Sequence, residues 1–144
     1  MKLSDLKNWN VEIEDKITKK WMDAERFAFD TKTKKKIYSI DTPPPYVNRP
    51  IHIGQAITYC YMDFFARYKR MKGFNVFYPF GTDDNGLPTE RLVEKRKKVR
   101  ARDMTREAFI KLCMDFLKEE LPGFIYDWKR IGASCDFNIY YSTI

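Results

Sequence analysis

An α/β domain built on a parallel sheet is the fold class that this sequence predicts. The chain has 144 residues, of which 44% are hydrophobic and 16% aromatic, and this is enough apolar material for one compact core. A strand-like run at residues 37–41, a helical pattern at 56–72 and a second strand-like run at 75–80 follow one another. Because two strands connected through a helix lie parallel, this order predicts a strand–helix–strand unit.

The N-terminal part has a helical pattern. Between residues 4 and 28, apolar side chains recur at spacings of about three to five, which predicts one or two amphipathic helices that pack on the body. These side chains are Leu6, Trp9, Ile13, Ile17, Trp21 and Met22. Residues 30–36, rich in Lys and Thr, are typical of a solvated turn. The strand at 37–41 ends before three consecutive prolines at 43–45, since proline cannot donate to a sheet ladder.

A helix and a second strand are predicted after the proline-rich loop. The helix covers residues 56–72 and closes at Gly73, and its stripe consists of Ile57, Cys60, Tyr61, Phe64, Phe65 and Tyr68. The second strand covers residues 75–80. Residues 81–86 then form a turn that leads into a charged helix at about 90–99.

The C-terminal third is predicted to contain two helices and a strand. Helical patterns cover residues 105–121 and 122–131, and the second begins at Pro122. From residue 135 to 143, Phe137, Ile139 and Tyr141 alternate with other residues, which indicates an extended strand. We find no internal repeat and no Gly/Ser-rich linker, so the sequence favours one domain.

Two loops carry the candidate ligand-binding residues. In open α/β sheets, ligands bind beyond the carboxyl ends of the strands, and the loops at 42–54 and 81–89 follow two such ends, so we expect them to face one crevice. His52 stands where the helix begins, and free backbone N–H groups there favour phosphate. The imidazole and the amide of Gln55 add donors, and Gly54 leaves room for a flat ring such as adenine. A lone histidine is otherwise more often a core or surface residue.

The charge balance permits a partner that carries phosphates. Lys and Arg outnumber Asp and Glu by 27 to 20, which gives a formal charge of +7, and a nucleotide or an RNA would suit this charge. Charge alone does not decide the point, because basic proteins without such partners are common. The Lys and Arg cluster from residue 91 to 102 fits either an RNA contact or a solvated helix face.

The cysteines and the apolar runs predict the cellular compartment of the protein. Cys60, Cys113 and Cys135 are odd in number and lack CxxC spacing, which argues against a disulfide framework and against a zinc site. A reducing cytoplasm fits this pattern. No apolar run reaches the length of a signal core or a membrane span, so no membrane partner is expected.

Two segments resemble conserved regions of the class I aminoacyl-tRNA synthetases. Residues 43–56, with His52-Ile53-Gly54-Gln55, resemble the HIGH signature, with Gln55 in the place of its last His. Residues 78–90, with Gly-Thr-Asp-Asp-Asn-Gly at 81–86, are similar to the second conserved region in the form seen in valyl enzymes of archaeal type. Residues 9–21 and 128–143 are also similar to this family, so the resemblance covers nearly the whole chain.

The resemblance implies a fold, a reaction and roles for individual residues. The fold would be the first half of a Rossmann-like (HUP-type) nucleotide-binding domain with N-terminal and C-terminal helices. The reaction would be ATP-dependent activation of valine and its transfer to tRNA(Val), with Mg²⁺ accompanying ATP and no zinc. His52 and Gln55 would be catalytic and, with Gly54, ATP-binding. Pro44, Tyr46 and Asp83 would bind the amino acid, with Asp83 on its amino group.

The resemblance also implies that parts of a synthetase are missing here. Residues 1–36 would be a helical entry segment, and residues 37–144 a partial catalytic domain that ends before the editing insertion. The family's KMSKS loop is absent from the sequence. We therefore expect the chain alone to be inactive or very weak and to expose an apolar edge, and a separate chain carrying the C-terminal half is a further candidate partner.

Three other interpretations stay open on the sequence alone. Isoleucyl- and leucyl-type synthetases share the same architecture as the valyl type. A nucleotide- or RNA-binding remnant without catalysis is a hypothesis from a different functional class. A dehydrogenase-like dinucleotide domain is disfavoured, because no GxGxxG follows either strand.

Overall fold

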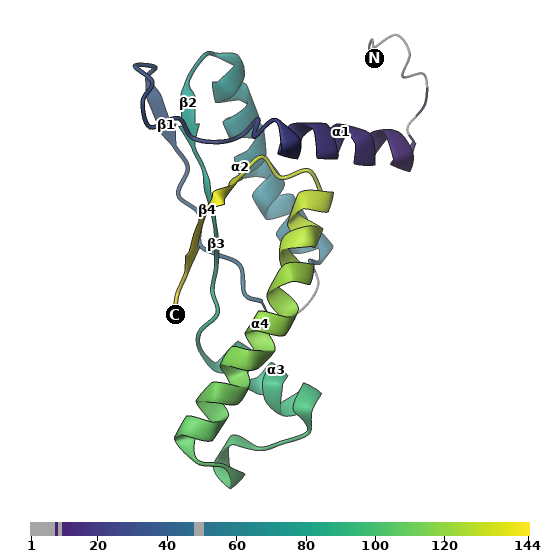
Figure 1. Cartoon of the computed structure of the whole chain (residues 1–144), viewed down its shortest axis with the longest axis vertical. Coiled ribbons are helices and arrows are strands. Elements are labelled where there is room, and N and C mark those ends of the chain that lie inside the picture. The colour runs from purple at the N-terminus through teal and green to yellow at the C-terminus, as the bar shows by residue number, and fades with distance from the viewer. Residues whose placement is uncertain (1–7, 9, 48–50) are drawn as a thin grey trace.

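A computed structural model describes residues 8, 10–47 and 51–144. Within these residues the helices are α1 (Val11–Asp23), α2 (Ile53–Met71), α3 (Leu87–Lys97) and α4 (Arg106–Arg130), together with a 3₁₀ helix η2 (Ala101–Asp103); the strands are β1 (Ile37–Ser39), β2 (Asn75–Phe77), β3 (Pro79–Thr82) and β4 (Asp136–Ser142). Helix α4 follows the long axis, α1 crosses one end, and α3 lies beside α4 at the other (Figure 1). None of the helices in the described part is long and apolar enough to cross a membrane.

The strands pair in parallel, which confirms the predicted fold class. β1 pairs with β2, from Ile37 opposite Asn75 to Ser39 opposite Phe77. β3 pairs with β4, and the register shifts between Pro79 and Phe80. The predicted single strand at 75–80 is therefore wrong in two respects: it is divided at Tyr78, and it continues through Gly81 and Thr82.

The division at Tyr78 has a local cause. Pro79 has no backbone N–H, so the ladder cannot continue regularly through this position. The carbonyl of Tyr78 instead accepts the N–H of Asp136, at 2.7 Å. The chain thus pairs with β1 before Tyr78 and with β4 after it, and β3 carries the residues at 81 and 82 toward the candidate site.

Helix α4 is continuous, so the predicted helix boundary at Pro122 is wrong. Pro122 lies inside a helix of 25 residues. A proline in a helix interior costs about 3 kcal/mol, because one hydrogen bond is lost and the ring clashes with the preceding turn. Burial of apolar side chains on both sides of the proline offsets this cost. Leu117 before the proline, and Phe124 and Trp128 after it, are buried in the core.

The main core lies between the two strand pairs and helices α2 and α4. Trp128 of α4 is 1% exposed and packs with Phe80 of β3 and Ala66 of α2. Helix α2 begins at Ile53, three residues before the predicted start, because His52 caps its N-terminus. Helix α3 likewise begins at Leu87 rather than near residue 90, with Pro88 in its first turn, where a missing N–H is tolerated.

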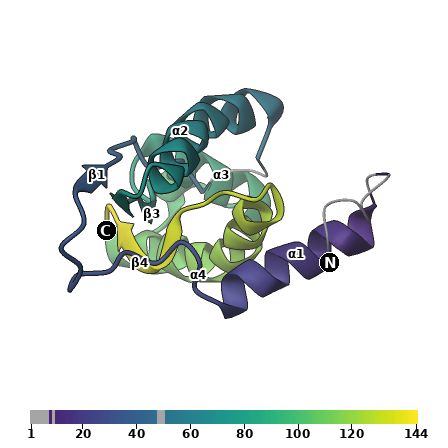
Figure 2. The same ribbon diagram turned by 90° about the horizontal axis from the view of Figure 1, so that it is seen from above.

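Helix α1 is a single helix that packs only partly on the body. Asn10 caps it by accepting the N–H of Glu12 at 2.7 Å. The predicted apolar residues Ile13, Ile17, Trp21 and Met22 are half-buried, and no residue of the helix is fully buried. Leu6 and Trp9, the other members of the predicted stripe, lie outside the described residues. Seen from above, α1 lies on the outside of the helices, away from β1 (Figure 2).

Candidate active site

The proline-rich loop and the end of β3 meet at Asp83. The backbone N–H of Asp83 donates to the carbonyl of Pro45 at 2.8 Å, and Tyr46 forms a parallel bridge with Asp83. The loop therefore runs beside the carboxyl end of β3 as a short extension of the sheet. This arrangement agrees with the expectation that the loops after two parallel strands meet at one edge.

Two hydroxyl groups hold the carboxylate of Asp83. The hydroxyl of Thr143 accepts the N–H of Asp84 at 3.0 Å and donates its own proton to Oδ1 of Asp83 at 2.9 Å. The hydroxyl of Tyr46 also bonds to Asp83, and this hydrogen bond with the nearby negative charge raises the pKa of Tyr46. Asp83 is half-buried. Its carboxylate is fixed in place and can still accept a further donor.

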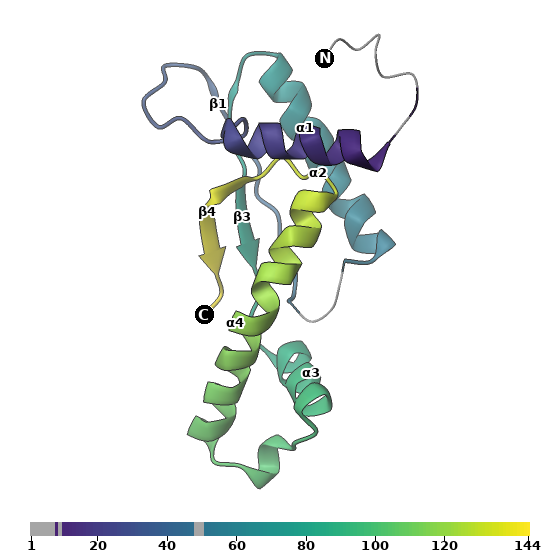
Figure 3. The ribbon, with the colours of Figure 1, turned by 45° about the vertical axis from the view of Figure 1, so that its right-hand side comes forward.

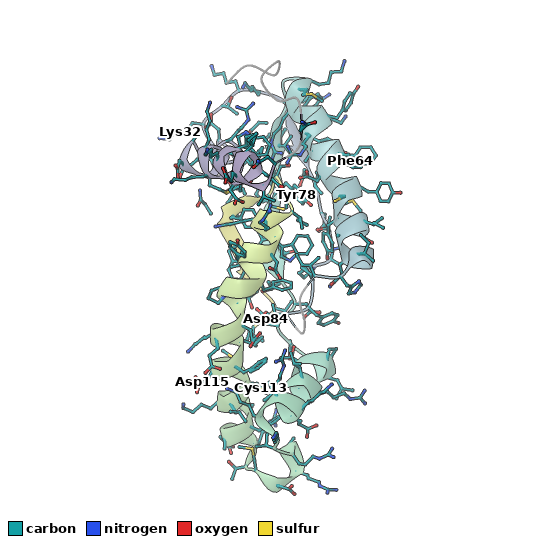
Figure 4. All side chains as sticks on the ribbon, turned by 90° about the vertical axis from the view of Figure 1, so that its right-hand side faces the viewer. Lys32, Phe64, Tyr78, Asp84, Cys113 and Asp115 are labelled. Atoms are coloured by element: carbon teal, nitrogen blue, oxygen red, sulfur yellow. The ribbon has the colours of Figure 1, made fainter. Side chains whose placement is uncertain are left out.

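A second carboxylate, Asp84, lies behind the first in a cluster of hydroxyl groups. It is 7% exposed, and its Oδ2 accepts protons from Thr82 at 2.8 Å and from Ser142 at 2.5 Å. Tyr140 bonds to Thr82 in the same cluster, and burial raises the pKa of Tyr140. The Oδ1 atom of Asp84 has no partner among the described residues. Figure 4 shows Asp84 between the part that contains α2 and the part that contains α3.

His52 and Gln55 form a reciprocal cap at the N-terminus of α2. The Nδ1 atom of His52 accepts the N–H of Gln55, and Oε1 of Gln55 accepts the N–H of His52, both at 3.4 Å. A neutral imidazole that accepts at Nδ1 carries its proton at Nε2. Nε2 of the ring and the NH₂ of Gln55 therefore stay available as donors, and both cap bonds are long enough to rearrange around a ligand.

The first turn of α2 offers further donors. The N–H groups of Ile53 and Gly54 have no partner among the described residues, and the positive end of the helix dipole lies there. A Cβ atom added at Gly54 would lie 3.2 Å from the imidazole of His52. Glycine therefore makes room for the ring of His52, which differs from its predicted role of leaving space for adenine, although the two roles are compatible.

Helix α2 and the proline-rich loop are joined directly. The hydroxyl of Tyr59 donates to the carbonyl of Pro43 at 2.5 Å. Pro44 lies beside Tyr59 and Gly81 at a small hollow, and a Cβ at Gly81 would collide with the ring of Tyr141. No hydrogen bond or ion pair connects His52 with Asp83 among the described residues, and residues 48–50 of the predicted motif lie outside them. The predicted site residues thus form two groups, which are joined through the contact of Tyr59 with Pro43.

The residues of β4 are the part of the site that the sequence interpretation missed. Ser142 is the last residue of β4, and Thr143 follows it as Asp83 follows β3; these two hydroxyl groups bond to the two acids of the turn. Ligands bind beyond the carboxyl ends of parallel strands, and for the predicted strand at 135–143 this rule points to the same hydroxyl groups.

The described residues contain no group of three or more His, Cys, Asp or Glu side chains placed to hold a metal ion. The predicted Mg²⁺ therefore finds no protein cage in this part of the chain. Magnesium usually keeps several waters and binds through one or two carboxylates and substrate phosphates.

The comparisons with known proteins identify the family. A family model described as tRNA synthetases class I (I, L, M and V) matches residues 16–144. The chain belongs to this family. The class I segment is 43% identical to the valine--tRNA ligase of Thermoplasma acidophilum, covering 92% of this chain and 17% of that protein. It is 44% identical to the valine--tRNA ligase of Methanocaldococcus jannaschii, covering 96% of this chain and 16% of that protein.

A solved structure supports the fold of this class I segment. The leucyl enzyme (LeuRS) of Agrobacterium radiobacter K84, in a ternary complex with tRNA and LeuAMS, matches with a TM-score of 0.69 at 21% identity. The match covers 90% of this chain and 15% of that chain. The segment thus spans about one sixth of the length of the synthetases that it matches.

Proposed function

We propose that this class I segment forms the part of a valine--tRNA ligase that binds ATP and valine and activates the amino acid. The named relatives support valine, since they are valine--tRNA ligases at 43–46% identity. The observation that carries the proposal is the meeting of the proline-rich loop, the end of β3 and the end of β4 at Asp83. The activated valine would then pass to tRNA(Val).

Asp83 binds the amino group of valine in this proposal. Its carboxylate is held by Tyr46 and Thr143 and offers free lone pairs, which is what an ammonium group requires. Pro44 and Tyr46 belong to the loop that runs beside Asp83, so they are placed to contact the rest of the amino acid. A hydrogen bond to a charged group contributes about 1.5–3 kcal/mol, enough to orient a small substrate.

His52, Gly54 and Gln55 bind the phosphates of ATP. The N–H groups at residues 53 and 54, which have no partner among the described residues, the Nε2 proton of His52 and the NH₂ of Gln55 make a set of donors at one helix N-terminus. The carboxylate of valine attacks the α-phosphate, and pyrophosphate leaves. Donors aimed at the phosphate stabilise the charge that develops there, and no covalent enzyme nucleophile is needed.

The remaining expectations belong to the same proposal. Residues 1–36 form an entry segment and residues 37–144 a partial catalytic domain, and the enzyme works in the cytoplasm with ATP, valine and tRNA(Val) as its partners. The rest of the synthetase, on the same chain or a separate one, contributes the parts that this segment lacks. The segment alone then has little or no catalytic activity.

Calorimetric titration of the purified chain tests the proposal. The ligands are valyl-sulfamoyl adenosine, a stable mimic of valyl adenylate, and its counterpart without the α-amino group. Asp83→Asn should weaken binding of the first ligand by about 10- to 100-fold and leave the second unchanged, because only the first has an ammonium group. His52→Ala should weaken both ligands to the same extent, since both carry the phosphate mimic.

Asp23→Asn is the matched control, because Asp23 is an exposed acid paired with Lys19 far from the site, and it should bind both ligands normally. Equal binding of the two ligands by the wild-type chain would contradict the role of Asp83 and favour a nucleotide-binding module without amino acid activation. Tighter binding of the leucyl or isoleucyl analogue than of the valyl one would contradict valine as the amino acid substrate.

A further inference from the structure

Nearly all of the net charge of the chain lies in one short segment. Residues 91–106 contain eight Lys and Arg residues and only two acids, Glu94 and Asp103, so their formal charge is +6. The whole chain carries +7. The other 128 residues are thus close to neutral, and the positive field of the molecule originates at one end. Figure 3 shows this end, where α3 and the start of α4 lie at the opposite pole from α1.

The backbone of this basic segment is fixed by its own small core. Val93 is fully buried and packs with Phe109 and Phe116 of α4. A side-chain oxygen of Glu94 accepts the N–H of Ala101 at 2.8 Å, which closes the chain between α3 and η2. The cations therefore project from a preformed surface, and little ordering of the backbone is needed when a partner binds.

The basic segment surrounds a hollow. A hollow of about 810 Å³ is lined by four cations, two acids and the apolar residues Val99 and Met104. The cations are Arg91, Lys95, Lys98 and Arg100, and the acids are Glu94 and Asp103. The four cations are exposed and form no ion pair with any described residue. Of the acids, Glu94 is occupied by a backbone N–H, and Asp103 pairs with Arg102. The hollow thus presents four positive charges that the described part of the chain does not pair.

We propose that this basic hollow binds the phosphate backbone of an RNA stem. The choice of RNA rests on the proposed function, in which tRNA is the partner that carries phosphates. The composition of the hollow supports this choice, because nucleic acid interfaces are polar and positively charged, whereas protein interfaces rely on buried aromatic and apolar anchors. Val99 and Met104, the apolar members of the lining, are half-buried in the core below.

The position of the hollow agrees with an RNA whose end reaches the candidate site. Helix α3 begins directly after the turn that carries Asp83, and its last turn contributes Lys95 to the hollow. Its 11 residues span about 16 Å at 1.5 Å per residue. A stem that extends away from the site along α3 brings its phosphates over the hollow, where exposed Lys and Arg side chains contact them without reading the sequence.

Fluorescence anisotropy with a labelled RNA hairpin and the purified chain tests this proposal. The triple variant Lys95→Gln, Lys98→Gln, Arg100→Gln should bind at least tenfold more weakly at low salt. The slope of log K against log salt should fall by about 2.7, because each lost phosphate contact contributes about 0.9. Lys16→Gln, Lys20→Gln, Lys34→Gln removes the same charge elsewhere and should change the affinity by less than about twofold.

Three outcomes would overturn the proposal. They are wild-type affinity in the hollow variant, an equal loss in both triple variants, and tighter binding of polyglutamate than of the hairpin, which would indicate an acidic protein partner. Circular dichroism verifies that each variant is folded. The hollow variant should still bind valyl-sulfamoyl adenosine like the wild type, so failure of the RNA site and failure of the activation site are measured separately.

Discussion

Asp83 is oriented by residues from distant parts of the sequence. Tyr46 reaches it from the proline-rich loop and Thr143 from the end of β4, so the carboxylate depends on the tertiary fold for its position. Thr143 also accepts the N–H of Asp84, which leaves its single proton for Asp83 alone. The hydroxyl of Thr143 therefore positions both the backbone at Asp84 and the side chain of Asp83.

Thr143→Val should weaken binding of valyl-sulfamoyl adenosine by about tenfold, because Asp83 loses a donor and samples other rotamers. Thr143→Ser keeps the hydroxyl and should restore binding. The analogue without the amino group should bind both variants like the wild type. Side-chain J-couplings of Asp83, measured by NMR, should show one rotamer in the wild type and averaging only in the Val variant. Equal effects of Val and Ser, or a single rotamer in both, would contradict this role.

The sequence predicted the residues of the first two loops but not those of β4. His52, Gln55 and Asp83 stand in local patterns, namely a helix start and an Asp-rich turn, which a linear reading can detect. Thr143 and the hydroxyls around Asp84 have ordinary neighbours in the sequence. Their contact with the two acids depends on the pairing of β3 with β4, which brings residues about 60 positions apart together, and no local sequence pattern reveals that pairing.

At the scale of elements, the prediction was most accurate where one physical effect dominates. Most strands and helices follow from hydrophobic periodicity, and the structure confirms their order, although the strand predicted at 75–80 is divided in two. Pro122 is different, because its local preference for a helix start competes with the burial of Leu117, Phe124 and Trp128 on a common core. The packing of these side chains outweighs the local cost, and a linear pattern contains no information about that packing.

A polar network attaches α2 to the turn before β4. Asp63 accepts the N–H of Ser134 at 2.7 Å and pairs with Arg67, and Arg70 donates to both the hydroxyl and the carbonyl of Ser134. Ser134 is fully buried, and burial lowers the pKa of Arg70. The network fixes where β4 begins, and β4 in turn delivers Thr143 to the site.

Asp63→Asn should lower the free energy of unfolding by about 2–3 kcal/mol, because Arg67 loses its ion-pair partner and the partly buried Arg70 loses a nearby negative charge, while the shape of the side chain is kept. Urea denaturation followed by circular dichroism measures this change. Asp115→Asn is the matched control, since Asp115 also pairs with a cation four residues away on a helix, but on an exposed surface, and its effect should be much smaller. Equal destabilisation by the two variants would show that the network is not structural.

The whole molecule has an apolar side that its own chain does not cover. Six side chains of α2, each at least 50% exposed, recur at spacings of three and four residues: Ile53, Ile57, Tyr61, Phe64, Tyr68 and Met71. Figure 4 shows Phe64 on the outer side of this helix. The expected apolar edge is thus a helix face among the described residues. Periodicity predicted the stripe, but it does not reveal whether a stripe faces a core or solvent.

An exposed apolar stripe of this length should make the purified chain associate with itself, because soluble monomers rarely expose such contiguous patches. Sedimentation velocity should show a weight-average mass that rises with concentration. Phe64→Glu should shift the chain toward the monomer, since it places a charge in the middle of the stripe. Tyr126→Glu is the control, because Tyr126 of α4 is exposed to 63%, close to the 62% of Phe64, but lies off the stripe. A wild-type chain that stays monomeric throughout, or equal effects of the two variants, would mean that the α2 stripe does not drive association.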